Sequence, residues 1–399
     1  MVLLIISTTS KAQQPFEDTL TYRESKVDAL FSFYNQDGKH SAVTGGKGSE
    51  KLQVYSTKIT GTHELDEKGT LYLYLGVDVI SSASTDSIDF ELSSASRVDQ
   101  HTSLSIGYSR QVSTEYEIGG NLYFSIESDY FSRGGEAWMQ FESKDQRKAA
   151  SLSFSAYFDD LRWGRLQPPY IIEARNLIYP VELRDSAWFD IHHRNSYNLS
   201  ATYRYDINKR MSLSFFPAYS FQEGLLSTPF HRVFLQNEAR PVVENLPTEK
   251  HMGVLGIGLN SFLASNLILR AYAQYYLDNF GLSSTLLKLE LPIKLSPKIN
   301  LIPGLRGTLQ QGSKYFAPYQ QHLRGEQFYT SDYDLSNFWS VSPGMAVSIN
   351  MTKPRSPNWQ LQQWSIRYRY YHREDGLKAH VITTYWNIDR NKTKVLAPY

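Results

Sequence analysis

Charged side chains at every second position of short segments are the residues best placed to do chemistry in this sequence. Arg367 and Arg369 alternate with aromatic and aliphatic residues, and Lys288 and Glu290 alternate with leucines. A spacing of two places side chains on one face of a β-strand, where guanidinium and carboxylate groups can bind or repel ions. The other charged residues in such alternating segments are Glu117, Glu136, Glu142, Arg204, Arg270, Lys294 and Arg306.

The sequence lacks the patterns of the common catalytic and metal sites. It has no cysteine, which excludes disulfides, thiolate ligands and cysteine catalysis. It contains no GxSxG, no P-loop and no HExxH, and no GxGxxG opens a helix. Nine of its 10 histidines fall in expected outer loops or at the outer ends of expected strands, and His63 is the exception. Polar residues collect in outer loops in any case, although imidazole beside carboxylates could also bind a metal. We therefore predict no catalytic residues, no cofactor and no metal site.

Composition narrows the class of protein that could position these charges. The chain has 399 residues, with 41 basic and 40 acidic, so nothing in its net charge of +1 favours nucleic acid as a partner. The mean hydropathy is −0.41 and no apolar run is long enough for a membrane-spanning helix. Aromatic residues nevertheless make up 14% of the chain, and 28 residues are tyrosine. A β-barrel with a wet interior and aromatic girdles has this composition.

Alternation of apolar and polar residues runs along most of the chain, and helical periodicity is nearly absent. Charged residues on the polar face would be buried if both faces were dry, whereas a barrel turns the apolar face to lipid and the polar face to its lumen. We predict an all-β fold, a transmembrane antiparallel β-barrel of about 16 strands. The strands are expected near residues 26–37, 51–64, 70–83, 99–112, 115–128, 135–144, 148–161, 194–207, 210–223, 250–263, 266–279, 284–296, 299–312, 338–351, 359–373 and 378–390.

The connections between these segments alternate in length. Every second one is short, as at Ser113-Thr114 and Asn208-Lys209, and most of the others are long, as at Arg162–His193 and Gly224–Glu249. Bacterial outer-membrane barrels have short periplasmic turns and long outer loops, and an even number of strands places both termini in the periplasm. Two soluble β-sandwich domains, the alternative, give no reason for this alternation. We predict the outer membrane of a Gram-negative bacterium, with its lipid around the barrel.

The first residues differ from the rest. Residues 1–14 hold a short apolar stretch, Val2–Ile6, followed by Ser10-Lys11-Ala12, and they resemble the end of a secretory signal peptide. An ordinary N-terminal segment is the alternative. Residues 15–399 show no internal repeat and no low-complexity linker, so we predict a single barrel domain there.

Long, non-repetitive strings in the expected outer loops resemble a known family. They are Ser41–Leu52, Ser81–Ser96, Gln222–Val233, Glu244–Pro247, Tyr315–Tyr319, Phe328–Ser336 and Asp375–Lys378. Together they resemble domain-of-unknown-function family 3570, exported proteins common in Bacteroidetes. The resemblance implies an exported protein without a defined activity, with flavin-transfer and thioredoxin-like proteins as neighbours.

Residues within these strings are candidates for a loop site, because loops on a rigid scaffold usually carry function. The alternative is that the loops pack on one another over the mouth of the barrel. The candidates are Thr44, Gly45, Gly46, Pro229, Phe230, His231, Arg232, Tyr315, Phe316, Pro318, Tyr329, Asp332 and Asp334.

Three functions fit these patterns. The first is a channel for small polar solutes or ions, in which acidic and basic walls impose a field across the lumen; in its alternative, the charges pair across a packed lumen. The second is a non-conducting scaffold that binds a surface lipoprotein or a periplasmic redox partner through its loops. The third, a lipid-cleaving barrel, needs a Ser/His pair at the rim. The sequence predicts no oligomeric state.

Overall fold

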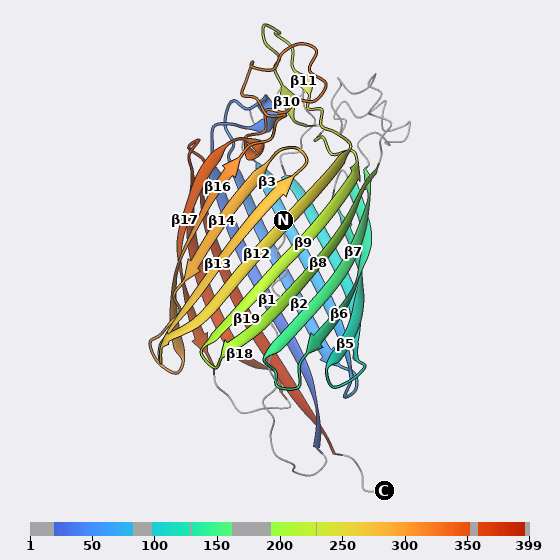
Figure 1. Cartoon of the computed structure of the whole chain (residues 1–399), viewed down its shortest axis with the longest axis vertical. Coiled ribbons are helices and arrows are strands. Elements are labelled where there is room, and N and C mark those ends of the chain that lie inside the picture. Colours follow the sequence, from blue (N-terminus) through green and yellow to red (C-terminus); the bar gives the residue numbers. More distant parts are fainter. Residues whose placement is uncertain are drawn as a thin grey trace.

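The computed structural model describes residues 20–82, 98–127, 130–161, 193–228, 230–351 and 358–395, and these form one closed β-barrel (Figure 1). Within them, one antiparallel sheet runs from β1 round to β19, and β1 pairs with β19 to close it. β14 and β15 both pair with β16 and form two halves of one wall strand, so the wall has sixteen strands, as the alternation predicts.

The wall strands follow one another in chain order round the barrel. They are β1 (Leu20–Asp37), β2 (Leu52–Glu64), β3 (Gly69–Ser82), β4 (Val98–Gln111), β5 (Tyr116–Ile126), β6 (Tyr130–Glu142), β7 (Lys148–Leu161), β8 (His193–Asn208), β9 (Met211–Gly224), β12 (Glu249–Ala264), β13 (Leu267–Asp278), β14 (Ser283–Glu290) with β15 (Ile293–Lys294), β16 (Ile299–Gln311), β17 (Phe338–Asn350), β18 (Gln360–Arg373) and β19 (Lys378–Val395).

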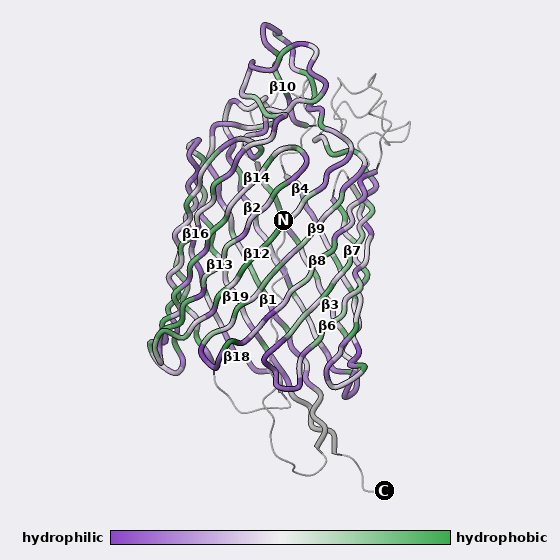
Figure 2. Tube along the Cα trace, viewed as in Figure 1, coloured by the Kyte–Doolittle hydropathy of each residue, from purple (hydrophilic) through white to green (hydrophobic). Residues whose placement is uncertain are grey.

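The alternating pattern decides which face of each strand looks outward. Leucines such as Leu73, Leu122 and Leu287 are exposed on the outer surface, at 48%, 62% and 57%. Their polar neighbours point to the lumen, and Figure 2 shows the alternation along the strands. In the described residues, no helix is long and apolar enough to cross a membrane.

The two ends of the barrel differ. At one, here called the turn end, short connections are closed by side chains: Asp66 accepts backbone hydrogen bonds from Lys68 and Gly69 at 2.8 and 2.7 Å. Ser113 accepts from Glu115 in the same way, at 3.2 Å. The long connections lie at the other end, here called the loop end (Figure 1).

Four of the expected strands differ in extent. β6 begins at Tyr130 rather than near residue 135. β1 begins at Leu20 rather than near residue 26, and β19 runs to Val395 rather than to 390. Their extensions, Leu20–Glu24 and Asn391–Val395, pair with each other beyond the neighbouring strands at the turn end, where lipid-facing alternation is not required. The strand expected near 284–296 is interrupted at Pro292, because proline has no N–H to donate to the sheet.

Three described connections at the loop end fold together, and are here called the cap: residues 38–51, 225–248 without 229, and 312–337. The cap contains a hairpin of β10 (Arg232–Val233) and β11 (Val242–Val243) and two short 3-10 turns, η1 (Ala42–Thr44) and η5 (Tyr333–Leu335). It stands above the barrel rim in Figure 1. Buried apolar side chains gather in it and just below it: Leu225, Val233, Val243, Leu246, Phe280, Leu282 and Leu377.

Candidate functional site

The basic wall of the lumen is built from strands β14, β16 and β18. Strand register places Arg306 of β16 directly opposite Lys288 of β14. Arg367 and Arg369 of β18 lie one strand beyond β17, beside Ala346 and Gly344 of that strand. Because the side chains on β17 are so small here, long side chains from the strands on either side can meet above it.

A single carboxylate neutralises part of this wall. Glu290, 7% exposed, contacts Arg367 at 2.8 Å and Lys288 at 3.2 Å between nitrogen and oxygen. β14 and β18 are not neighbours in the sheet, so the contact with Arg367 crosses the inner face of β16 and β17. In contrast, Arg306 and Arg369 form no ion pair with any residue in the described ranges. Two positive charges of the basic wall therefore lack an acidic partner.

The acidic residues on β5 and β6 lie in the opposite part of the barrel, six to eight strands away round the closed sheet. Glu117 accepts a hydrogen bond from Ser109 at 2.5 Å, and Glu136 accepts one from Asn121 at 3.0 Å. Both hydrogen-bond partners are neutral side chains. These two carboxylates and the basic wall thus lie on opposite sides of the barrel.

Not every predicted lumen charge belongs to these walls. Arg204 of β8 lies 3.8 Å from Glu142 of β6 and 3.7 Å from Asp206, so it is neutralised locally. Arg270 of β13 lies opposite Glu290 in the register. Lys294 is exposed in β15 at the turn end, where it lies opposite Asn300 in the register and donates its backbone N–H to the carbonyl of Asn266 at 2.8 Å.

A cavity of about 500 Å³ opens at the basic wall below the cap, and is here called the arginine cavity. Arg306, Arg367, Arg369 and Arg373 line it. Its other walls are tyrosine, aliphatic and small polar side chains from β1, β17, β18 and β19, together with two carboxylates from the cap: Tyr34, Gln36, Glu50, Asp334, Ser342, Tyr371, Leu377, Val381 and Thr383.

Arg373 joins the barrel wall to the cap. Its side chain is 3% exposed and forms ion pairs with Asp375, at 2.7 Å, and with Asp334 of η5. Gln310 of β16 also donates to the carbonyl of Asp334, at 2.8 Å. The third cap loop is therefore held down against the basic wall at one point, beside the arginine cavity.

Glu50 closes the cavity on the side of β1. Burial raises the pKa of Glu50 to about 7, although the positive charge of Arg373 opposes this. Its Oε2 atom is buried and has no hydrogen-bond partner among the described residues. The Glu50 carboxyl group is consequently part protonated near neutral pH and can donate a hydrogen bond into the cavity.

A buried acid lies at the centre of the cap. Glu244 is 2% exposed and accepts from the backbone N–H of Thr228 at 2.8 Å and from the hydroxyl of Thr330 at 2.5 Å. The Nδ1 atom of His231 lies 3.4 Å from the Glu244 carboxylate and 3.8 Å from the carboxylate of Asp332. Two of the three cap loops, from 225–248 and 312–337, thus meet at one carboxylate.

The charges in this cluster are set by their neighbours. Burial alone would lower the pKa of His231, but the Glu244 carboxylate and its hydrogen bond, with Asp332 beyond, raise it to about 9. Burial favours the neutral form of Glu244, yet His231 and the hydrogen bonds hold its pKa below the usual value. Burial raises the pKa of Asp332 to about 6 against the pull of His231. At neutral pH the cluster contains an imidazolium between two carboxylates.

Gly45 and Gly46 are required where the first cap loop touches the other two. Both have positive φ, 76° and 82°, a conformation that L side chains rarely adopt. A Cβ on Gly45 would lie 2.6 Å from the Phe234 ring, and one on Gly46 would lie 2.8 Å from the carbonyl oxygen of Ser331. Thr44 stabilises this turn by donating to the carbonyl of Ser41 at 3.3 Å.

Aromatic rings pack the third cap loop. Tyr315 meets Phe280 edge-on at 5.3 Å between ring centroids and Phe328 at 5.5 Å. Phe316 meets Tyr333 in the same way at 5.2 Å. Such contacts fix loops rather than leave a free aromatic surface.

The remaining loop candidates also belong to the cap. Tyr329 exchanges both backbone hydrogen bonds with Asn245, at 2.7 and 3.1 Å, and Arg232 is buried at 3%. The other three candidates hold turns or lie half-buried in the cap: Asp332 accepts from the N–H of Asp334, Pro318 from that of Gln321, and Phe230 follows Pro229, which itself lies outside the described residues.

Sequence reasoning missed Arg373, Glu50, Glu244 and Asp375. The first could have been found by continuing the series Arg367, Arg369 along the same strand face. The other three stand within or at the end of the family strings, but nothing in their local sequence indicates which partner they meet. Among the described residues, no three histidine, aspartate or glutamate side chains are grouped to hold a metal ion.

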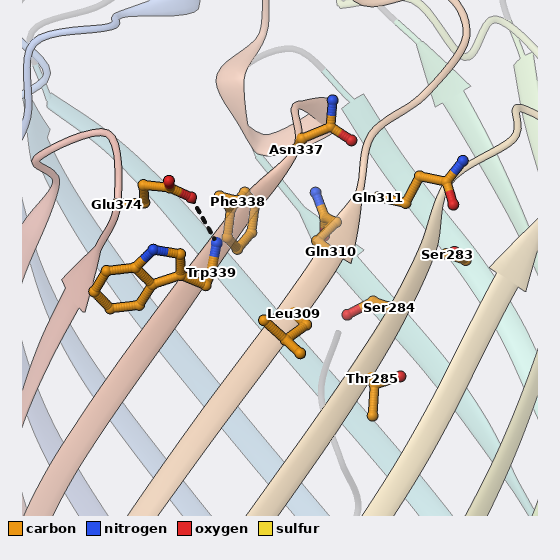
Figure 3. A pocket seen from close by; sticks show the side chains of 10 residues that line it. All are labelled: Ser283, Ser284, Thr285, Leu309, Gln310, Gln311, Asn337, Phe338, Trp339 and Glu374. Carbon is orange, nitrogen blue, oxygen red and sulfur yellow. Dashed lines mark hydrogen bonds between the residues drawn. The ribbon is translucent and has the colours of Figure 1, made fainter.

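A second cavity, of about 420 Å³, lies near the loop end across β14, β16 and β17 (Figure 3). Serine, threonine and glutamine side chains line it beside Leu309 and Trp339, which face outward at 66% and 42% exposure. Glu374 accepts a hydrogen bond from the backbone N–H of Trp339 at 3.3 Å. This cavity is a shallow polar notch at the rim and holds no grouped charges.

No curated protein matches this sequence significantly. Among solved structures, a bacterial polysaccharide outer membrane secretin aligns over 91% of this chain and 98% of its own, with 8% identity and a TM-score of 0.47. OpdK of Pseudomonas aeruginosa with vanillate aligns over 92% and 98%, with 7% identity and a TM-score of 0.42. A BenF-like porin from Pseudomonas fluorescens Pf-5 aligns over 93% and 99%, with 6% identity and a TM-score of 0.43.

At these identities the structural likenesses concern the fold and nothing that the relatives bind. The sequence itself is more specific, because the model of one family matches residues 93–386. That continuous stretch contains most of the wall, two of the three cap loops and all four arginines of the arginine cavity. The chain belongs to the family described as "Protein of unknown function (DUF3570)".

Proposed function

We propose that the barrel is a channel for small polar solutes or ions in the outer membrane of a Gram-negative bacterium, with its turn end and both termini in the periplasm. Short turns on the periplasmic side and long loops outside are the rule for bacterial barrels. Outer-membrane lipid then covers the exposed leucine face.

One observation carries the channel proposal: side chains that point into the lumen are still exposed to solvent. Arg270 and Arg306 both lie on the inward face of their strands, and both are exposed. A packed interior would have buried these two guanidinium groups or paired them with acids. A barrel of sixteen strands is wide enough to enclose water.

The test is single-channel conductance of the refolded full chain in a planar bilayer. Arg306→Gln combined with Arg369→Gln removes the two positive charges without an acidic partner, and the expected result is a shift of the reversal potential towards cation selectivity. Lys298→Gln, in an exposed turn at the turn end, is the control for loss of one charge. A folded barrel that passes no current under any of these conditions contradicts the proposal.

A second function, a non-conducting scaffold for a surface lipoprotein or periplasmic redox protein, is supported by the cap. The cap projects beyond the rim in Figure 1. In its third loop Leu323 and Arg324 are exposed. If the barrel is such a scaffold, it conducts no current, and deletion of residues 319–327 abolishes binding of its partner. The same deletion in a conducting barrel leaves the current or increases it.

A further inference from the structure

The arginine cavity carries more positive charge than its neighbours neutralise. Arg373 is paired with Asp334 and Asp375, and Arg367 with Glu290, but Arg306 and Arg369 pair with no acid in the part of the chain that the structure describes. Arg306 also faces Lys288 directly across the strand pair, and like charges in that position destabilise a sheet. Arg369 lies near enough to Arg306 and Arg367 to be repelled by both, and Glu290 offsets part of this repulsion. An anion placed among these arginines would remove that repulsion.

Strand β17 leaves the space in which the arginines can converge. Its inward side chains between β16 and β18 are small, and the middle one is Gly344. A Cβ there would lie 2.9 Å from the carbonyl oxygen of Tyr368 and 3.4 Å from the Cβ of Arg369, so no larger residue fits without movement. The guanidinium group presents a planar fork of N–H donors that matches the two oxygens of a carboxylate.

The same cavity also has an apolar side. Leu377 and Val381 line it together with the rings of Tyr34 and Tyr371. Its volume of about 500 Å³ lies within the range of small-molecule pockets. A bare inorganic anion would use the arginines and leave the apolar side in contact with water, whereas an apolar body attached to the anion would cover it.

We propose that the arginine cavity binds a small organic carboxylate, with the carboxylate between Arg306 and Arg369 and its apolar body against the tyrosine and aliphatic side chains. The proposal rests on the proposed function in that the lumen is the path by which the solute reaches the cavity. Glu50 lines the same cavity, and its raised pKa leaves the carboxyl group partly neutral at pH 7, which reduces its repulsion of the ligand.

Binding is measured by isothermal titration calorimetry of the full chain, folded in detergent, with sodium benzoate at pH 7. Benzyl alcohol is the neutral probe of the same shape, and inorganic phosphate is the anion without an apolar body. The variants are Arg306→Gln, Arg369→Gln and Arg369→Lys, the last of which keeps the charge but loses the fork. Lys298→Gln is the matched control: Ile299, the next residue, begins β16, and Arg306 lies about 25 Å further along the strand.

The expected result is saturable binding of benzoate and none of benzyl alcohol. Each glutamine variant should weaken it about 10- to 100-fold, as expected for loss of a charge-assisted hydrogen bond. Arg369→Lys should weaken binding less, and Lys298→Gln should leave it unchanged. Absence of saturable binding, or equal binding by all variants, overturns the proposal, and phosphate binding as tight as benzoate overturns the role of the apolar side. Calorimetry does not depend on transport, so the two proposals can fail separately. A barrel that binds benzoate but passes no current supports the binding site and contradicts the channel. A barrel that conducts but does not bind benzoate supports the channel and contradicts the binding site.

Discussion

Raising the pH should loosen the cap before it affects the barrel. The pKa of His231 is raised to about 9 from an ordinary 6.5, chiefly because Glu244 outweighs the effect of burial. A group whose pKa is raised on folding stabilises the structure fully below its unfolded pKa and loses that effect as the pH passes its folded pKa. The stabilisation by His231 is thus present at pH 6.5 and is lost as the pH rises through about 9.

The magnitude follows from the two pKa values. Each pKa unit corresponds to about 1.4 kcal/mol, so the whole contribution is on the order of 3 kcal/mol. Much of it, about 2 kcal/mol, is still present at pH 7.5 and is lost by pH 9.5, which corresponds to a factor of about 20 in the opening equilibrium. Glu244, whose pKa is lowered, and Asp332, with a pKa of about 6, titrate below this window and do not contribute to the change.

Hydrogen exchange followed by mass spectrometry measures this opening directly. Peptides from 225–248 and 313–337 should lose protection about 20-fold between pH 7.5 and 9.5 after correction for intrinsic exchange, while peptides from β7 do not. Glu244→Gln removes the acid that raises the His231 pKa, so the cap of this variant should be less protected at pH 7.5 and change little with pH. Cap protection in the native chain that stays constant over this range refutes the reasoning.

Three further predictions concern the cap and the basic wall. Gly46→Ala should destabilise the cap by about 1–3 kcal/mol and speed its proteolysis, whereas Gly325→Ala, at a positive φ of 99° with nothing within 4 Å, should cost less because no clash is added. Glu290→Gln removes the acid that neutralises Arg367, so the reversal potential of the open channel should move towards anion selectivity; an unchanged value contradicts the assignment of this wall. Arg373→Met should release Asp334, and cap peptides should then be cleaved sooner by protease while the barrel remains folded.

Much of the barrel is predictable because its pattern is local. A strand between lipid and water needs an apolar residue at every second position, and this period is visible in the sequence of one strand alone. It also identifies Arg306, Arg367 and Arg369 as inward-facing. Pro292 could have indicated the break between β14 and β15. Because the apolar alternation continues on both sides of Pro292, the pattern alone predicts one uninterrupted strand.

The cap could not be predicted in the same way. Glu244 and Thr330 are 86 residues apart in the chain, and their hydrogen bond depends on two loops that share no repeating pattern. The family strings indicate which segments matter but not which of them touch. Likewise, the pairing of Arg373 with Asp334 joins a strand to a loop 39 residues earlier, which no periodicity reports.

The seam between β1 and β19 sets the order in which this protein can be assembled. Leu20 pairs with Val395, so the first and last strands of the wall are partners in the closed sheet. Any shorter length of chain, however well its hairpins form, is an open sheet with two unpaired edges, and such edges pair readily with other chains. Closure therefore depends on the synthesis and delivery of β19. Until then the edges of the growing sheet must be protected from pairing with other chains. Removal of β19 alone would leave a chain with fifteen of its wall strands but no closed barrel.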